Sequence, residues 1–381
     1  MSLSPTGSSD HPISETRAAT TREIPCLDGW RAVSITLVVL SHSLWHASRA
    51  AEKMGALGVN LFFAISGYLI CTLLLREREL TGKISLQRFY IRRFFRIVPP
   101  AVSYLLVVAL CGGLGWIQLG PHEVSTAFLT ANYFPDRSWF TAHCWSLSVE
   151  EHFYLAWPGL LVLLGPYGAS AVGLLLSAAS VVYRPWAAAN VVGGFRYQRT
   201  DMRIDTFVLP CLLAILLRNR RWQDRVAKYL PPLAIVPLVA VVVAGSYLAE
   251  GYPEYQTFNK LLLATVLPLI VVTPILHGKS LLARILSLEI LKGLGRVSYG
   301  VYLWQQIFLF DTSSSSGRML LMPLALVGIL LVAWMSNQFL EEPLRAMGRR
   351  LASRPDTASP AAGGNDRSTR PLGAFWARRT D

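Results

Sequence analysis

Ten apolar segments divide the sequence, and each is long enough, or nearly so, to cross a membrane as a helix. Of the 381 residues, 52% are hydrophobic and only 15% are charged, whereas soluble proteins carry about 25% charged residues. The sequence therefore predicts an all-α fold, a polytopic transmembrane bundle of about ten helices. The predicted segments are residues 27–46, 58–76, 97–118, 145–164, 168–184, 204–218, 231–249, 258–276, 296–311 and 319–340.

Lys and Arg gather in three of the loops between these segments, at residues 76–96, 218–228 and 279–296, and again in the C-terminal tail. Cytoplasmic loops of membrane proteins carry such an excess of positive charge. We therefore expect a multi-pass protein of the cytoplasmic (inner) membrane with both termini in the cytoplasm.

Two polar tails are predicted to flank a single membrane domain at residues 24–350. Residues 1–23 are rich in Ser and Thr, and residues 351–381 are basic and rich in Pro, Gly and Ala, which predicts disorder for both. The net charge of +13 is dispersed among apolar segments, so no nucleic-acid partner is expected. The five scattered cysteines show no metal-ligand spacing, so neither a disulfide framework nor a metal site is indicated.

The first segment carries two polar residues that are unusual within a membrane, Arg31 and His42. At about 100° per residue, their spacing of eleven residues places them on one face of a helix. They would lie roughly 16 Å apart along its axis. We expect them to line one interior cavity, because charged groups in a membrane normally face such a cavity. The alternative is that Arg31 reaches the membrane surface and His42 only marks the end of the helix.

A basic motif, RFYIRRFFRIVPP, begins at Arg88. Arg92 and Arg96 are four residues apart and share a helical face, with Arg93 beside them. Such a cluster could bind lipid phosphates at the membrane border. It could equally clamp the phosphates of a nucleotide-like carrier such as coenzyme A, because the guanidinium fork matches phosphate oxygens.

A third motif, WSLSVEEHFY, contains the adjacent carboxylates Glu150 and Glu151. Adjacent helical positions differ by about 100°, so we expect one of them to face the cavity and the other a neighbouring helix. The alternative is an interfacial helix start, where acidic residues suit the helix dipole. The small residues Ser66 and Gly67 indicate close helix packing within their own segment.

Five blocks of this chain, in order, resemble the integral-membrane acyltransferases known as acyltransferase family 3, which include bacterial O-antigen and exopolysaccharide O-acetylases. The resemblance spans residues 27–350 and implies transfer of an acyl group, usually acetyl, from acetyl-coenzyme A to a hydroxyl. Residues 24–350 would then be a transmembrane acyltransferase domain. The blocks are LDGWRAVSITLVVLSH, GVNLFFAISGYLI, RRFFRIVPP, WSLSVEEHFY, and LGRVSYGVYLW with the later Glu341–Pro343.

The resemblance also implies roles for particular residues. Arg31 and His42 match the family's essential pair, and Glu150 and Glu151 match its paired glutamates. The residues that match the family's donor-linked basic motif are Arg92, Arg93 and Arg96. Arg31 is expected to help bind the donor, while His42, Glu150 and Glu151 are expected to be catalytic. Substrate contacts are expected from Asn60, Ser66, Trp145, Ser146, Tyr299 and Tyr302, although the two tyrosines suit a membrane interface equally well.

Three positions depart from the family's pattern. Asn60 stands where many members have Asp, His152 where Gln is common, and Gln305 where a His often follows the Tyr-Leu-Trp triplet. His42 is thereby left as the main candidate for a general base. The extracytoplasmic esterase-like domain that some members carry is not seen in this sequence, so we expect direct delivery of the acyl group or a partner protein on the outer face.

These features together predict a membrane O-acyltransferase that modifies a cell-surface or exported glycan. Acyl-coenzyme A is the expected co-substrate, and membrane lipid is expected to surround the protein. No permanently bound cofactor or metal is expected. The same reaction on a macrolide-like antibiotic or a lipid remains open, as does a different class, a transporter of polysaccharide or small acids. Direct transfer to the hydroxyl and transfer through an acyl-His42 intermediate are both compatible with these residues.

Overall fold

The computed structural model describes residues 24–44, 49–134, 137–190, 196–251, 255–309 and 315–353. These residues form helices and turns and contain no β-strand, which confirms the all-α prediction. The predicted tail at residues 1–23 lies outside the described residues, as does the C-terminal tail from residue 354. The long helices are α2 (Pro25–Ser43), α3 (Arg49–Thr81), α4 (Leu86–Gly113), α7 (Cys144–Asn190), α8 (Ile204–Leu216), α9 (Arg220–Tyr229), α10 (Ile235–Gly251), α11 (Gln256–Leu276), α13 (Glu289–Phe308), α14 (Ser315–Ser336) and α15 (Glu342–Ala352).

Six helical stretches among the described residues are long and apolar enough to cross a membrane, so the predicted count of ten is not confirmed. They are Ala51–Thr81, Leu86–Gly113, Trp139–Ala187, Pro232–Ala249, Gln256–Leu276 and Met322–Ala352. Two predicted segments, 145–164 and 168–184, merge in α7, which bends at Gly165, where φ is 66°, just before Pro166. Helix α8 has the predicted apolar character but only 13 residues.

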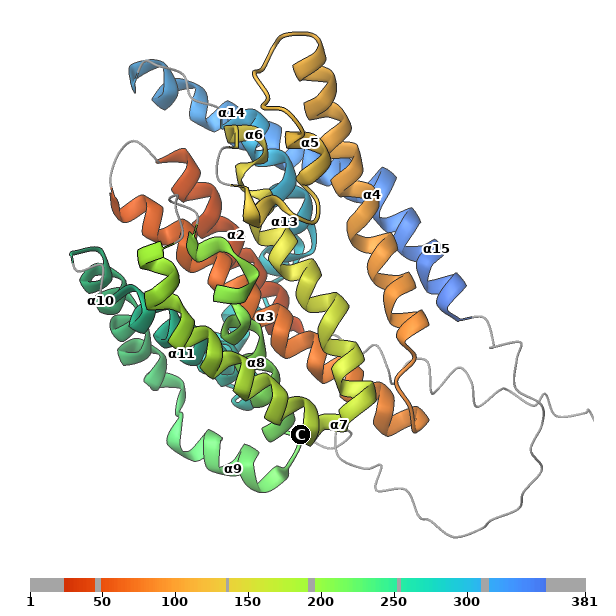
Figure 1. Ribbon diagram of the computed structural model, residues 1–381, viewed down its shortest axis with the longest axis vertical. Coiled ribbons are helices and arrows are strands. Elements are labelled where there is room, and N and C mark those ends of the chain that lie inside the picture. Colours follow the sequence, from red (N-terminus) through yellow and green to blue (C-terminus); the bar gives the residue numbers. More distant parts are fainter. Residues whose placement is uncertain are drawn as a thin grey trace, which may run out of the picture.

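Helix α2 lies between α3 and α13, and glycines allow the three helices to approach closely (Figure 1). A Cβ atom at Gly295 of α13 would collide with the backbone of Asp28 of α2, and one at Gly29 of α2 would collide with Leu286 at the end of the short helix α12 (Leu281–Leu286). Gly58 of α3 faces the Ser34 carbonyl of α2 in the same way. The close approaches at Gly58 and Gly295 therefore hold α2 directly against α3 and α13.

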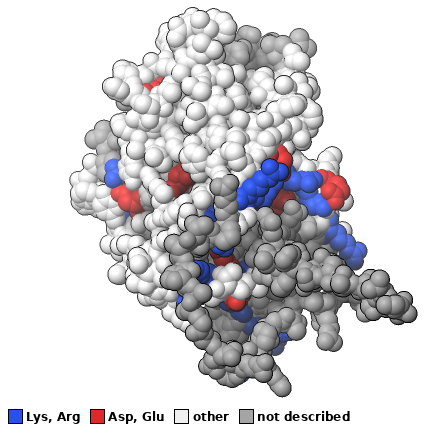
Figure 2. Space-filling model, turned by 90° about the vertical axis from the view of Figure 1, so that its right-hand side faces the viewer, with Lys and Arg blue, Asp and Glu red and all other residues white. Residues whose placement is uncertain are grey.

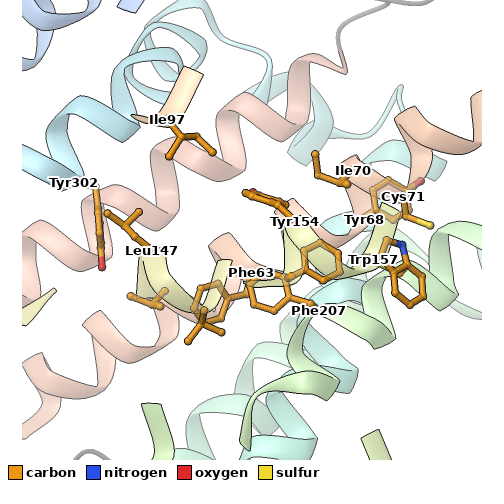
Figure 3. Close-up of a cluster of buried hydrophobic side chains, with 14 of the residues drawn as sticks. Phe63, Tyr68, Ile70, Cys71, Ile97, Leu147, Tyr154, Trp157, Phe207 and Tyr302 are labelled. Carbon is orange, nitrogen blue, oxygen red and sulfur yellow. The ribbon is translucent and has the colours of Figure 1, made fainter. Parts of the chain in front are cut away.

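An aromatic cluster joins α3, α7 and α8 in the centre of the molecule (Figure 3). The Phe207 ring stacks on Phe153 at a centroid distance of 4.7 Å and contacts Phe63 at 4.6 Å. Gly67 packs against the Phe207 backbone, which confirms that this small residue serves close helix packing. Tyr302 and Trp157 mark opposite ends of the cluster in Figure 3, and Tyr154 lies between them.

Charged side chains occupy a restricted part of one face of the molecule. In Figure 2 the top of the face on the α4 and α15 side is nearly free of charge, and Lys and Arg lie together with Asp and Glu across its middle. Large apolar side chains are exposed on the long helices, among them Leu106 of α4 and Leu163 of α7. Such a surface is typical of a membrane-embedded protein.

Candidate active site

Five helices, α2, α3, α4, α7 and α13, enclose a cavity with an empty volume of about 780 Å³ that includes its open mouth. Its walls are partly apolar, with Phe63, Leu147 and Ile97 contributed by the aromatic cluster and its surroundings. Sites for small ligands usually combine apolar walls with a few convergent polar groups. The polar lining residues are Arg31, Ser66, Arg93, Arg96, Ser146, Glu150, Glu151, Tyr154, Ser298, Tyr299 and Tyr302.

Arginines from two helices contribute positive charge to the cavity wall. Arg31 of α2 is paired with Asp28 at 2.6 Å. The guanidinium of Arg93 lies over the Tyr154 ring, 3.6 Å from the centroid. Neither Arg93 nor Arg96 forms an ion pair with a carboxylate in the described part of the chain, although Arg93 neighbours Glu151 and Arg96 neighbours Glu341.

Arg92 differs from its two neighbours in the basic motif. Its side chain is 43% exposed, does not line the cavity, and lies 3.5 Å from the carboxylate of Glu77. Successive side chains of a helix are rotated by about 100°, and this rotation turns Arg92 away from the cavity that Arg93 lines. The motif predicted as one donor-binding unit is therefore divided between the cavity and the surface.

Both glutamates of the third motif line the cavity, so the prediction that one of them faces a neighbouring helix is wrong. The Glu150 carboxylate accepts hydrogen bonds from Ser66 Oγ at 2.5 Å and from the Tyr154 hydroxyl. Glu151 makes no hydrogen bond to the residues that the structure describes, and its neighbouring cation is Arg93. The cavity is wide enough that two adjacent positions of α7 both border it, one toward α3 and one toward α4.

Hydroxyl groups line the part of the cavity formed by the start of α7 and the middle of α13. The Ser146 hydroxyl lies 2.5 Å from the Tyr302 hydroxyl, which also donates to the His143 carbonyl oxygen at 2.9 Å. Tyr299 lines the same cavity and donates to the Ile97 carbonyl oxygen at 2.9 Å. Both tyrosines predicted to contact substrate therefore face the interior rather than the membrane interface.

His42 does not line this cavity, so the expectation that it shares one cavity with Arg31 is not met. Its ring packs edge-on against Trp139 at a centroid distance of 5.4 Å, and the side chain of Gln305 lies beside it. Gln305 belongs to the same helix as Tyr302, three residues further on. His42 thus lies beyond the hydroxyl-lined wall of the cavity rather than within it.

Two other predicted substrate contacts, Asn60 and Trp145, also lie off the cavity. Asn60 accepts from Arg203 Nη1 at 2.9 Å and donates to the Ala56 carbonyl at 2.7 Å. The Arg203 guanidinium also lies 5.3 Å from the centroid of the Trp145 ring. The side chain of Asn60 is therefore held by the buried Arg203 and is not part of the cavity wall.

The cavity and its surroundings use polar residues that the sequence reasoning did not select. Tyr154 and Ser298 line the cavity and His143 lies behind Tyr302, and the sequence assigns none of the three a role in the site. Their only sequence signal is proximity to the glutamate motif and to the tyrosines of residues 294–304. No group of three or more side chains suited to hold a metal ion is found in the described ranges.

Trp139 belongs to a short helix, α6 (Trp139–Ala142), in the connection between α4 and α7. Glu123, earlier in the same connection, holds this helix in place. The Glu123 carboxylate accepts from the Ser138 and Gly120 backbone N–H groups at 2.9 and 2.7 Å, and from the hydroxyls of Ser138 and Thr141. Burial by itself would raise the pKa of Glu123, but these hydrogen bonds to the ionised form lower it below its ordinary value.

Comparison with known proteins identifies the family of this chain and several of its relatives. A family model described as "Acyltransferase domain" matches residues 24–338. The peptidoglycan O-acetyltransferase OatA of Listeria monocytogenes is 27% identical over 85% of this chain and 56% of its own length. The putative peptidoglycan O-acetyltransferase YrhL of Bacillus subtilis is 28% identical over 87% of this chain and 56% of its own.

A putative O-acetyltransferase of Staphylococcus aureus is 29% identical over 74% of this chain and 50% of its own length. The chain thus spans about half the length of the curated relatives that it matches. No solved structure matches it. Because the family model covers most of the sequence, the chain belongs to the integral-membrane acyltransferases of acyltransferase family 3.

Proposed function

We propose that this protein is a membrane O-acyltransferase that moves an acyl group, acetyl in the simplest case, from acyl-coenzyme A to a hydroxyl of a cell-surface or exported glycan. The observation that carries the proposal is the cavity itself, which is bordered by Arg93 and Arg96, neither of them in an ion pair with a described residue, and by the hydroxyls of Ser146 and Tyr302. The named relatives support a glycan as acceptor, because two of them are named for peptidoglycan.

The proposed donor site uses the arginines of the cavity wall. Guanidinium groups bind phosphate oxygens through paired, charge-assisted hydrogen bonds, and coenzyme A carries a pyrophosphate and a ribose phosphate. Arg93 and Arg96 would hold these phosphates, with Arg31 guiding the pantetheine arm into the cavity. The thioester would then lie near Ser146 and Tyr302.

The proposed acceptor approaches from the opposite side, where His42 lies beside Gln305. Neutral His42 takes the proton of the acceptor hydroxyl, and the hydroxyl oxygen forms a bond to the thioester carbonyl carbon. The carbon–sulfur bond then breaks, and the departing sulfur takes the proton from His42. Donor and acceptor would meet at the wall formed by Ser146 and Tyr302, so that wall must open during turnover.

The donor's compartment supports an orientation for the chain. Coenzyme A is cytoplasmic, and Arg93 and Arg96 follow a loop rich in Lys and Arg, as expected for the cytoplasmic side. We therefore place the start of α4 at the cytoplasmic face of the inner membrane, with both termini in the cytoplasm. A partner protein on the outer face would carry the acyl group onward if the glycan cannot reach the membrane.

Binding and turnover of acetyl-coenzyme A by the purified full chain test this proposal. We expect saturable binding of coenzyme A, and transfer of labelled acetyl to glycan in membrane vesicles made from cells that produce the protein. Mass spectrometry of surface glycan from cells with and without the protein should differ by one acetyl unit. Label in lipid or in an antibiotic would change the acceptor, whereas no binding or consumption of acetyl-coenzyme A would favour a transporter and contradict the proposal.

A further inference from the structure

A second histidine, His143, lies at the hydroxyl-lined wall of the cavity. It joins α6 to α7, and its side chain is only 4% exposed. Its ring packs edge-on against Tyr302 at a centroid distance of 5.3 Å and against Tyr104 at 5.5 Å. Tyr302 lines the cavity and touches this ring, so a single aromatic side chain stands between the imidazole and the cavity.

Both ring nitrogens of His143 lack a hydrogen-bond partner among the described residues. The Leu303 carbonyl lies beside the ring, but the geometry of a hydrogen bond is not reached. A buried polar atom without a partner destabilises the folded state, and an apolar group of the same shape would avoid that penalty. Phenylalanine could make the same edge-on contacts with Tyr104 and Tyr302. Packing alone therefore gives no reason for an imidazole at this position.

The groups around His143 are those that the proposed reaction uses. The Tyr302 hydroxyl donates to the His143 carbonyl oxygen at 2.9 Å and lies 2.5 Å from the Ser146 hydroxyl. His42 packs on Trp139, at the start of the short helix that ends one residue before His143. Two histidines from distant parts of the sequence therefore flank the same short helix beside the hydroxyl-lined wall.

Resting on the proposed function, we propose that His143 is a catalytic residue that stabilises the oxyanion formed from the thioester. A neutral imidazole presents one N–H donor in either tautomer. When the acceptor oxygen bonds to the carbonyl carbon, negative charge develops on the carbonyl oxygen and the His143 N–H donates to it. As the carbonyl double bond re-forms, the carbon–sulfur bond breaks and the negative charge leaves with the sulfur, which takes the proton from His42; His143 neither gains nor loses a proton. Once the wall of Ser146 and Tyr302 has opened, a donor buried away from water suits this task.

Two substitutions separate this role from a structural one. His143→Phe keeps the ring shape and removes the donor, and His143→Gln keeps an N–H donor on a flexible side chain. His277→Gln is the matched control, since His277 contacts the Leu230 carbonyl at 3.0 Å and does not line the cavity. Each full-length variant is compared with wild type for thermal stability, coenzyme A binding, and the kcat and KM of acetyl transfer from acetyl-coenzyme A.

We expect His143→Phe to melt at or above the wild-type temperature, to bind coenzyme A normally, and to lose about 10²–10³-fold in kcat with KM unchanged. His143→Gln should retain at least about 10-fold more activity than His143→Phe, because a donor is worth that or more. Transfer by His143→Phe at the wild-type rate, a clear loss of its stability, or a His143→Gln as inactive as His143→Phe would each overturn the assignment. If wild type and His277→Gln also fail to consume acetyl-coenzyme A, the proposed function itself is at fault.

Discussion

Arg93 lies over the ring of Tyr154, with its guanidinium carbon 3.6 Å from the ring centroid. The hydroxyl at the edge of the same ring donates to Glu150, which Ser66 also holds. One tyrosine therefore connects a cation at the cavity wall to a carboxylate in its interior. In a site that binds an anionic donor and transfers an acyl group, this side chain would place the phosphate-binding and reacting groups relative to one another.

Removing one contact of Tyr154 should have a different effect from removing both. Tyr154→Phe keeps the ring beneath Arg93 and loses the hydrogen bond to Glu150, so we expect kcat to fall about 10-fold with little change in KM for acetyl-coenzyme A. Tyr154→Leu loses both contacts, and KM should also rise about 3–30-fold, the range of a cation–π interaction. Initial rates measured against acetyl-coenzyme A concentration check this. Identical kinetics for the two variants would show that the ring contact has no role.

The three arginines of the basic motif should separate in their effect on the donor. Arg96→Gln removes a cation that lines the cavity without an ion-pair partner, and we expect KM for acetyl-coenzyme A to rise about 10–100-fold, as for other charge-assisted hydrogen bonds. Arg92→Gln, at an exposed position beside Glu77, should change KM less than about 3-fold. Coenzyme A binding measured for both variants at low and raised salt is the test. Equal losses of coenzyme A affinity in the two variants would contradict a specific donor site and favour binding of lipid phosphates by the whole motif.

The helical class could be predicted because apolar segments can be recognised in the sequence without knowledge of any contact between them. It also selected most of the polar residues around the cavity, since Arg31, Ser66 and Tyr302 stand out within apolar runs. Helix count was less predictable, because α7 runs through Gly165 as a bent helix and α8 is short. The partners of Asn60 and the position of His143 depend on contacts between distant segments, which helical periodicity does not encode.

His42 should affect chemistry without affecting donor binding. It lies beside Trp139 and Gln305 rather than in the wall of the cavity. We therefore expect His42→Ala to lower acetyl transfer about 10²–10⁴-fold, the usual contribution of a general base, while coenzyme A binds as tightly as to wild type. Isothermal titration with coenzyme A and a transfer assay on the same preparations measure both quantities. Full transfer by a folded His42→Ala protein would exclude both the general-base and the acyl-His42 routes.

The turn that carries Trp139 should be sensitive to acid through Glu123. Hydrogen bonds from Ser138, Thr141 and Gly120 hold the pKa of this carboxyl below its ordinary value of about 4.3. A lowered pKa in the folded state means that the unfolded chain binds a proton more readily. The stabilisation by Glu123 is therefore fully present above about pH 4.3 and is lost as the pH falls through the folded-state pKa.

Thermal melting of wild type and Glu123→Gln in detergent, from pH 7 to pH 3, tests this dependence. We expect the variant to melt several degrees lower at pH 7 and the difference to shrink as the pH falls below about 4.3. Glu52→Gln, at an exposed position of α3, is the matched control and should follow wild type throughout. A difference between wild type and Glu123→Gln that stays constant down to pH 3 would mean that the ionised carboxylate is not what holds this turn. In that case the contact between Trp139 and His42 would have to depend on packing alone.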